Sequence, residues 1–482
     1  MERLFLGNNY TDLGRWLNTD KSRILNWKDL IFALSPDKIS SVRSKISENL
    51  FQKPRGTRDI LPADQKYWRF FQAMGEKILD GLGFSRIDTP LFEDKRIFER
   101  GIGASTDIVE KEIYLLESVA DDEDPQFALR PEGTAGVARA YIENGMSSWP
   151  QPVRLYYFGP MYRRERPQRG RYREHRQVGV EIIGDASAKS DYLVIMAGYE
   201  ILKNIGLVDL TVSLNSIGCS DCRPKYLKKL KNYYANYLDK VCEDCRRRYD
   251  KNPLRLLDCK NDLCIKIKAK APQILDKLCD KCRDHFQETL EYLDDFGIKF
   301  NLDPTLVRGL DYYTRTVFEI FLNSDKERKI ALCGGGRYDD LISTLGGAKT
   351  PAVGWGMGAD RVVEELKSSD FKPPKSRGVE VVILELGATA RKVCKQIFNA
   401  FEKADINVFY IPAKDSLRGQ LKMASKLNAD YAIIVGQKEA LSGSVIVRDL
   451  RSGTQEDLSI KKAVETIKTK YDSDNRNCSN FS

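Results

Sequence analysis

The sequence predicts an α/β (α+β) protein with two folded parts, and three observations indicate this class. Between Arg154 and Glu181, two segments rich in aromatic and β-branched residues flank an arginine-rich loop, which is typical of a β-hairpin. Between Cys219 and Cys282, paired cysteines lie in lysine-rich helical sequence, as in an insertion. After Gly378, strand-like segments alternate with helical ones, which predicts a separate α/β domain with a mixed or mostly parallel sheet.

The composition limits the classes of protein to consider. The 482 residues, 42% of them hydrophobic, suffice for two or three domains with cores. The net charge of +9 favours a polyanionic partner, although many proteins of this charge bind no nucleic acid. There is neither a membrane-spanning apolar run nor a secretory signal, so we expect a cytoplasmic protein that binds no membrane. Acidic residues such as Glu2 and Asp12 disfavour an organellar leader without excluding one.

The first regular element is expected after residues 1–52, to which no function can be assigned. Apolar residues recur at helical spacing from Asp64 to Leu82, which predicts an amphipathic helix packed on a core or on a dimer face. The segment after it, residues 84–94, is predicted to be a strand that ends at Pro90.

The hairpin carries eight arginines and three glutamates between Arg154 and Glu181. A guanidinium is charged at any working pH and offers a planar fork of donors, so this cluster suits phosphate oxygens. A solvated, charge-rich loop is the alternative. Glu165 within the cluster, and the bend expected at Pro167 and Gly170, favour a binding role.

The sequence Arg130-Pro-Glu-Gly-Thr134 offers a carboxylate and a hydroxyl directly before a predicted helix. Glu132 and Thr134 could together hold an ammonium group. A capped helix start explains the same residues equally well.

Four cysteine pairs lie in the helical stretch, and three of them have the C-x-x-C spacing that lets two thiolates bind one tetrahedral Zn²⁺. They predict one or two structural zinc sites, and the alternative is reduced, non-ligating thiols. The pairs are Cys219 with Cys222, Cys242 with Cys245, Cys259 with Cys264, and Cys279 with Cys282.

Two segments after this stretch carry further polar groups. Arg308, Tyr312 and Tyr313 directly precede a predicted strand and could project toward one pocket, although a surface loop with two tyrosines is the alternative. Three glycines at positions 334–336 are predicted to let the backbone approach a ligand closely, and Tyr338 adds a hydroxyl.

Small residues from Gly354 onward precede a helix predicted to begin near Ala359. Arg361 in its first turn can reach a triphosphate, assisted by the positive potential of the helix N-terminus. The alternative is a surface arginine beside a helix cap.

Residues 368–378 have the composition of a linker. Strand-like segments after it alternate with helices predicted at 388–403 and 416–427. The tail, residues 472–482, is expected to be disordered.

These motifs resemble those of class II aminoacyl-tRNA synthetases. The run Tyr162-Arg163-Arg164-Glu165 with Gln177 and Glu181 is similar to motif 2, the helix and strand of 64–94 to motif 1, and Gly354–Leu366 to motif 3. The segments RERPQRGRYR, RGLDYYT and CGGGRYDDLI resemble signatures of the histidyl-tRNA synthetase family in particular.

The resemblance implies a domain order. It implies an N-terminal extension at 1–52, an antiparallel-sheet catalytic domain at 53–216 and 302–367, a helical insertion at 217–301 and an anticodon-binding domain at 379–471. It also implies activation of histidine by ATP with Mg²⁺, transfer to the 3′ end of tRNA(His), and a homodimer.

Site residues follow from the same resemblance. Arg163 and Arg308 would be catalytic and bind the α-phosphate, Glu165 and His175 would lie at the adenine, and Arg361 at the γ-phosphate. Glu132, Thr134 and Gln177 would hold the ammonium group of histidine, Glu181 and Tyr313 the imidazole, and Tyr312 and Tyr338 would complete that site. The loop from Arg166 to Gln168 would touch the tRNA acceptor end.

The chain departs from the family pattern at one point. His175 and Arg176 stand where the family has Phe-His, and the family's phenylalanine stacks on adenine. A weaker stack or a shifted loop is therefore expected here.

Two other classes of protein have related sequences and are alternatives here. A silent paralogue, such as the regulatory subunit of the histidine-biosynthetic phosphoribosyltransferase, is expected to lack the arginines of motifs 2 and 3 and the C-terminal domain. A synthetase-like domain of a stress kinase needs kinase sequence upstream, which fifty residues do not provide.

Overall fold

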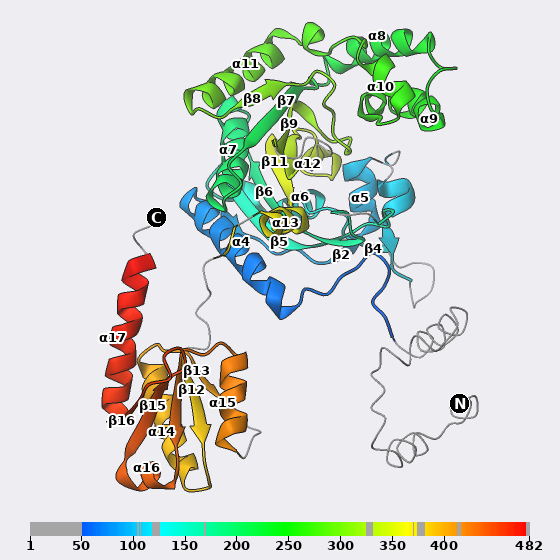
Figure 1. Cartoon of the computed structure of the whole chain (residues 1–482). Helices are drawn as coiled ribbons and strands as arrows, with labels where there is room; N and C mark the ends of the chain where they lie inside the picture. The colour runs from blue at the N-terminus through cyan, green and yellow to red at the C-terminus, as the bar shows by residue number, and fades with distance from the viewer. Residues whose placement is uncertain are drawn as a thin grey trace, which may run out of the picture. The chain divides into compact units, whose positions relative to one another are not determined.

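The computed structural model describes residues 51–103, 106, 108–117, 126–167, 170–323, 331–369, 371–373, 381–411 and 416–478, without the side chains of 471–478. It divides into two compact units (Figure 1). The first comprises Met1–Ile60 and Lys77–Glu364, and the second comprises Leu61–Glu76 and Glu365–Ser482, each within the described ranges. The predicted extension 1–52 lies outside the described residues except for its last two.

The first unit is built on an eight-stranded sheet of order β1-β5-β6-β11-β10-β9-β7-β8. Its strands are β1 (Ser85–Arg86), β5 (Val153–Tyr162), β6 (Glu174–Ile183), β11 (Ala352–Gly358), β10 (Cys333–Arg337), β9 (Thr314–Leu322), β7 (Leu210–Ser216) and β8 (Phe300–Leu302). All neighbours pair antiparallel except the two edge pairs, β1 with β5 and β7 with β8. The predicted antiparallel core is therefore confirmed.

The predicted arginine-rich hairpin is the pair β5 and β6, which is in continuous register from Val153 opposite Ile183 to Tyr162 opposite Glu174. Side chains alternate between the two faces of a strand. On β6, Val178, Val180 and Ile182 consequently form one apolar, buried face, while Gln177 and Glu181 point to the other.

The strand predicted at 84–94 is wrong in detail, because it consists of two short strands. β1 joins the central sheet, whereas β2 (Phe92–Asp94) pairs with β4 (Phe127–Leu129), and β4 pairs with β3 (Tyr114–Leu115). Pro90 lies between β1 and β2. Proline cannot donate to a ladder and restricts the residue before it, so a continuous strand is broken there.

The helices predicted over 64–82 and from Ala359 are present as α4 (Pro62–Gly81) and α13 (Ala359–Ser368), and each crosses the division between the two units, after Glu76 and after Glu364. The other helices of the first unit outside the insertion are α5 (Lys95–Ile102), the π-helical turn Ile108–Glu112, α6 (Thr134–Glu143), the 3₁₀ turn Met146–Ser148, α7 (Ala188–Asn204) and α12 (Leu341–Thr344). α7 packs on β6, β9, β10 and β11, and Trp355 of β11 donates its indole N–H to the Val194 carbonyl of α7. One face of the sheet is thus closed by α7, and the other face is left for polar side chains.

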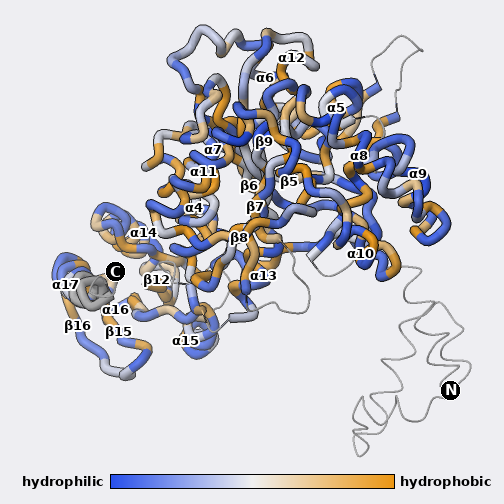
Figure 2. Tube along the Cα trace, turned by 90° about the horizontal axis from the view of Figure 1, so that it is seen from above, coloured by the Kyte–Doolittle hydropathy of each residue, from blue (hydrophilic) through white to orange (hydrophobic). Residues whose placement is uncertain are grey.

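The predicted helical insertion lies between β7 and β8. It contains α8 (Arg223–Ala235), α9 (Glu243–Lys251), the 3₁₀ helix Pro253–Asp258, α10 (Asp262–Lys268), the 3₁₀ turn Leu275–Lys277 and α11 (Asp280–Asp295). α11 packs on α7, and β8 begins at Phe300, so the predicted end at residue 301 overlaps the central sheet. α9 is largely hydrophilic along its length (Figure 2).

The second unit has a five-stranded sheet of order β13-β12-β14-β15-β16. Its elements are β12 (Val381–Glu385), α14 (Ala390–Lys403), β13 (Val408–Tyr410), α15 (Leu417–Lys426), β14 (Tyr431–Val435), α16 (Gln437–Ser442), β15 (Ser444–Asp449), β16 (Gln455–Ser459) and α17 (Ile460–Cys478). β13, β12 and β14 are parallel, and β15 and β16 continue antiparallel, which confirms the predicted mixed sheet.

Three features of this part of the chain differ from the sequence prediction. The strand β16 and the helices α16 and α17 were not expected. The tail predicted to be disordered is helical as far as Cys478, and residues 479–482 lie outside the described ranges. Of the predicted linker, residues 374–378 are outside them as well. Among the described residues, none of the helices combines the length and apolar content needed to cross a bilayer.

Candidate active site

Glycines open the polar face of the central sheet. Gly354 lies opposite Glu181. Gly356 lies opposite Gly179, which is two residues after Gln177 and on the same face of β6. A Cβ atom on Gly354 would overlap the Glu181 carboxyl, and one on Gly356 would overlap the Gln177 amide. Because these strand positions lack side chains, the long polar side chains of β6 can lie flat across β11.

The glycines of β10 serve the same purpose, so the prediction that they admit a ligand to the backbone is wrong. They form a fully buried strand, and a Cβ atom on Gly334 would lie 2.6 Å from Nη1 of Arg308. On Gly336 it would lie 3.0 Å from Cδ1 of Tyr313. The open space is filled by the two side chains from the RGLDYYT segment.

A buried group of carboxyls and hydroxyls occupies this face, and we call it the tyrosine–carboxylate cluster. Its members are Glu132, Thr134, Tyr157, Gln177, Glu181, Tyr312, Tyr313 and Tyr338. The structure thus brings together every residue that the sequence assigned to histidine binding, and it adds Tyr157.

Glu181 is the centre of the cluster. Thr134 donates its hydroxyl to Oε1 at 2.8 Å, and Tyr338 donates to Oε2. Burial raises the pKa of the Glu181 carboxyl to about 8, and the nearby Glu132 carboxyl adds to this effect, although the two hydroxyl donors oppose it. The raised pKa of Glu181 favours the protonated carboxyl near neutral pH in the unliganded chain.

Glu132 caps helix α6. Its two carboxyl oxygens accept the backbone N–H groups of Thr134 at 2.7 Å and Ala135 at 2.8 Å, and the hydroxyl of Tyr312 is 3.5 Å away. Burial raises the pKa of this carboxyl too. The capped helix start considered as an alternative is therefore present, and the same carboxyl also faces the cluster.

Tyr157 was missed by sequence reasoning. Its ring fills the space above Gly133 and Gly179, and its hydroxyl accepts the Gln177 side-chain amide at 3.1 Å. The hairpin register contains the signal, because Tyr157 is opposite Gly179 and so shares a face with Gln177 and Glu181.

A second site adjoins the cluster at Gln177, and we call it the arginine pocket. It is a depression of about 150 Å³. It is lined by Arg163, Glu165, Gly170, Arg171, Tyr172, His175, Arg176, Gln177, Gly356, Gly358, Asp360 and Arg361. Four arginines from the hairpin and from helix α13 therefore surround one depression.

The backbone fixes the two arginines expected to bind nucleotide. Arg163 donates Nε–H to the Pro131 carbonyl at 2.8 Å, and its Nη1 lies 3.8 Å from Oε1 of Glu165. Arg361 donates to the carbonyls of Gly170 at 2.9 Å and Ala331 at 3.0 Å. Burial, together with the nearby positive charges of Arg171 and Arg163, lowers the pKa of Arg361, as expected in a site short of anions.

His175 lies between these cations. Burial lowers the pKa of its imidazole to about 3, with the charges of Arg163 and Arg361 contributing. The ring is therefore neutral, and it lines the pocket at the position where the family has phenylalanine.

Arg308 reaches the same face from the segment before β9. Its guanidinium forms an ion pair with Glu319, and this pair outweighs the effect of burial and raises the pKa of Arg308. Glu319 also acts electrostatically on Arg361, so it lies near both arginines. Glu319 was not predicted. It lies two residues after Val317 on β9 and so shares a face of the strand with it, and this spacing was the available signal.

Of the two residues predicted to touch the tRNA, one lies away from the site and the other is outside the described residues. Arg166 is exposed in the hairpin loop and does not line the arginine pocket, and Gln168 lies outside the described residues. Their expected contact with a tRNA end is not tested by these positions.

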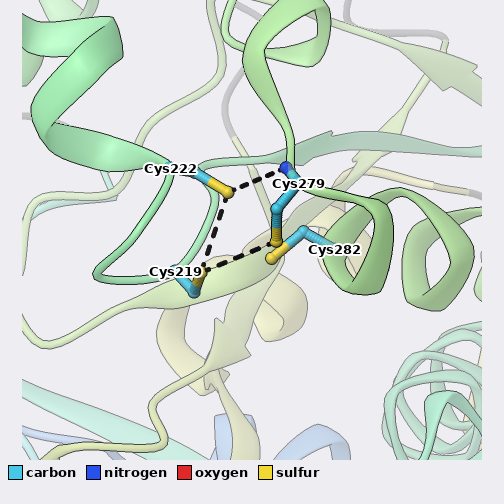
Figure 3. A group of neighbouring side chains, drawn as sticks. All are labelled: Cys219, Cys222, Cys279 and Cys282. Carbon is cyan, nitrogen blue, oxygen red and sulfur yellow. Dashed lines mark hydrogen bonds between the residues drawn. The ribbon is translucent and has the colours of Figure 1, made fainter.

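The eight cysteines gather in two groups rather than in the four pairs visible in the sequence. Cys219, Cys222, Cys279 and Cys282 form one group, which Figure 3 shows converging from α8 and α11. Cys242, Cys245, Cys259 and Cys264 form the other. In each group all four sulfur atoms lie within 4.8 Å of one another, as a tetrahedral thiolate site requires.

An antiparallel sheet that gathers arginines from three distant segments beside a polar cluster defines the catalytic domain of a class II aminoacyl-tRNA synthetase. Comparison with known proteins agrees. The family model described as histidyl-tRNA synthetase matches residues 56–222 and 249–362, and an anticodon binding domain model matches residues 380–470. The chain belongs to the histidyl-tRNA synthetase family, so it is an aminoacyl-tRNA synthetase, an enzyme of the ligase class.

Individual relatives are similar over nearly their whole length. A histidine–tRNA ligase of Thermoanaerobacter pseudethanolicus is 43% identical over 419 residues, which is 87% of this chain and 99% of that protein. One from Dehalococcoides mccartyi is 41% identical over the same extent. The structure of apo S. aureus histidyl-tRNA synthetase superimposes with a TM-score of 0.73 at 31% identity, covering 87% of this chain and 100% of the other.

Proposed function

We propose that this chain activates histidine with ATP to histidyl-adenylate at the joined arginine pocket and tyrosine–carboxylate cluster, and transfers it to the 3′ end of tRNA(His). One observation carries the proposal. Cations from three segments meet beside a buried cluster of carboxyl and hydroxyl groups, and Gln177 belongs to both sites.

The arginines suit attack of a carboxylate on the α-phosphorus of ATP. This reaction needs no side-chain nucleophile, because positioning the two anions and neutralising the charge of the transition state accelerate it. Arg163 and Arg308 would hold the α-phosphate, and Arg361 the γ-phosphate. Mg²⁺ bound to the phosphates supplies additional charge neutralisation.

The adenine would lie at Glu165 and His175. A neutral imidazole can stack on a base but offers a smaller ring face than phenylalanine. The lowered pKa of His175 supports this role, because a third cation beside Arg163 and Arg361 is avoided.

The tyrosine–carboxylate cluster suits an imidazole. Glu181 and Tyr313 would bond its two nitrogens, and Glu132, Thr134 and Gln177 the α-ammonium group. Buried groups left unpaired by an apolar amino acid impose a large penalty, so the cluster discriminates without an editing step.

The titration of Glu181 gives a testable pH dependence. Its pKa is raised from 4.5 to about 8 in the folded chain. The unfolded chain releases this proton at lower pH, so the free energy of unfolding falls as pH rises from about 4.5 toward about 8, by roughly 1.4 kcal/mol per pH unit. Glu181→Gln removes this loss. We expect the melting temperature of the parent to fall relative to that of the variant as the pH rises through that window. Melting temperatures that change with pH in parallel would contradict the raised pKa.

We further propose that both cysteine groups bind Zn²⁺, with structural roles. The four sulfur atoms of each group lie within 4.8 Å of one another, which is close enough to bind one tetrahedral ion and supports this proposal. Elemental analysis of protein purified without chelator is expected to give two zinc ions per chain. Cobalt substitution should then give the thiolate charge-transfer absorption of a Cys₄ site, and a metal-free, fully folded protein would contradict the proposal.

A homodimer is proposed as the working form. The small sheet of β2, β3 and β4 presents exposed apolar side chains, among them Leu91, Phe92, Leu115 and Phe127, which are 38–51% exposed. Leu91 and Phe92 belong to the segment that resembles motif 1. Large exposed apolar patches commonly mark interfaces.

Placing a charge on this patch tests the dimer. We expect Phe92→Arg to shift the protein from dimer to monomer in analytical ultracentrifugation, because a guanidinium cannot be buried there without a partner. Leu263→Arg, a matched change at an exposed leucine of α10, should leave the dimer intact. A dimer that tolerates Phe92→Arg would assign the contact to another surface.

The activity itself is tested by exchange of pyrophosphate into ATP with each amino acid in turn, and by charging of tRNA(His). Exchange should depend on histidine alone. Folded protein that shows no histidine-dependent exchange would refute the proposal.

A further inference from the structure

The group Cys219, Cys222, Cys279 and Cys282 lies where the insertion leaves and rejoins the central sheet. Cys219 follows β7, Cys222 directly precedes α8, and Cys279 directly precedes α11 (Figure 3). The Cys279 N–H points to the Cys222 sulfur at 3.1 Å, and the sulfur atoms of Cys219 and Cys222 are 3.7 Å apart. A metal bound here would fix both ends of the insertion at once.

The chain at this group is bonded directly to the segment that carries Tyr312 and Tyr313. The Ile217 N–H donates to the Arg315 carbonyl at 2.7 Å, and the Arg315 N–H donates to the Gly218 carbonyl at 2.9 Å. Arg315 has φ of +48°, a conformation that costs energy for a residue with a side chain. The backbone beside Cys219 therefore helps to hold a strained residue of β9, which lies two residues after Tyr313.

Arg223 makes a second connection. It directly follows Cys222, and its guanidinium donates to the Tyr313 carbonyl. Tyr313 in turn lies over Gly336 and beside Tyr312, with ring centroids 4.7 Å apart. A displacement of Cys222 is thereby passed through one side chain to the cluster that would bind histidine.

The other cysteine group differs in its connections. It lies among α9, the following 3₁₀ helix and α10, within the insertion. It reaches the same segment through Asn252, which lies midway between Cys245 and Cys259 and donates to the Asp311 carboxylate at 2.6 Å. That contact is to a side chain. Within the described part of the chain, no residue next to a cysteine of this group forms a hydrogen bond to Tyr312 or Tyr313.

We propose that the metal at the Cys219 group is a positioning device for histidine binding, whereas the metal at the Cys242 group stabilises the insertion alone. This inference rests on the proposed function and on zinc binding at both groups. Arg223 is the positioning residue that carries the effect to Tyr313.

Matched double variants separate the two groups. Cys219→Ser with Cys222→Ser, and Cys242→Ser with Cys245→Ser, should each lower the zinc content from two ions to one per chain. For the first pair we expect the KM for histidine in pyrophosphate exchange to rise about tenfold or more, as for loss of a charge-assisted contact. The KM for ATP should change little. For the second pair both constants should stay within about threefold of the parent, while the melting temperature falls in both cases.

Arg223 gives a test that leaves every cysteine in place. Arg223→Met should keep two zinc ions per chain, weaken histidine binding in calorimetry about tenfold, and leave ATP binding unchanged. Arg223→Lys, which retains a donor, should restore part of the loss. This pattern is not expected of a general loss of stability.

The outcomes separate the possible failures. A parent protein without zinc overturns the metal sites, and one with zinc but without histidine-dependent exchange overturns the proposed function. If both are sound, equal effects of the two cysteine pairs, or normal histidine binding in Arg223→Met, overturn the positioning role.

Discussion

Arg308→Ala is expected to reduce histidine-dependent pyrophosphate exchange by about a thousandfold or more. Its guanidinium lies on the open face of the sheet over Gly334, and it is the proposed ligand of the α-phosphate. The loss should appear in kcat as well as in kcat/KM, because charge on the phosphate increases in the transition state. Steady-state exchange at varied ATP and histidine measures both constants.

Two controls accompany this variant. The fold should survive, since Glu319 is the one ion-pair partner of Arg308 among the described residues. Circular dichroism and the melting temperature check this. Arg247→Ala, which removes an exposed arginine of α9 paired with Asp244, should leave exchange unchanged. Near-normal exchange by folded Arg308→Ala would refute its assigned role.

Ending the chain before Gly378 should reduce charging of tRNA(His) about a hundredfold or more while adenylate formation stays near normal. The strands and helices from β12 to α17 form their own apolar cores on both faces of the mixed sheet, and they contribute no residue to the arginine pocket or to the tyrosine–carboxylate cluster. Their proposed role is to bind the anticodon, which bears only on the second step.

The two assays on one preparation act as controls for each other. Added in large excess, tRNA should restore part of the charging rate, because the lost contacts mainly weaken binding. Equal loss of exchange and charging would mean that this unit serves the structure of the catalytic unit.

Much of the fold was predictable because its signals are local. The aromatic and β-branched residues within 153–162 and 174–183 identify both strands of the hairpin, and the spacing of Trp68 and Phe71 with their successors identifies α4. The arginines that meet in the arginine pocket were recognised from motifs rather than from spacing, and their convergence depends on a strand order that no local pattern contains.

Other features depend on contacts between distant residues. The glycines at 334–336 were predicted to let the backbone approach a ligand, yet they form a buried strand. A Cβ atom there would meet Arg308 over Gly334, and the backbone carbonyls of Gly354 and Thr316 over Gly335 and Gly336. The cysteines appear as four pairs in sequence. The first pair meets the last only because the insertion leaves the sheet after β7 and rejoins it at the neighbouring strand β8. Glu319 and Tyr157 became visible as site residues once strand register was known.

The most direct test of the account is a crystal structure of the full chain with histidinol and a non-hydrolysable ATP analogue. We expect the α-phosphate to contact Arg163 and Arg308, the γ-phosphate to contact Arg361, and the imidazole to lie between Glu181 and Tyr313. A nucleotide bound elsewhere, or an imidazole outside the tyrosine–carboxylate cluster, would contradict it.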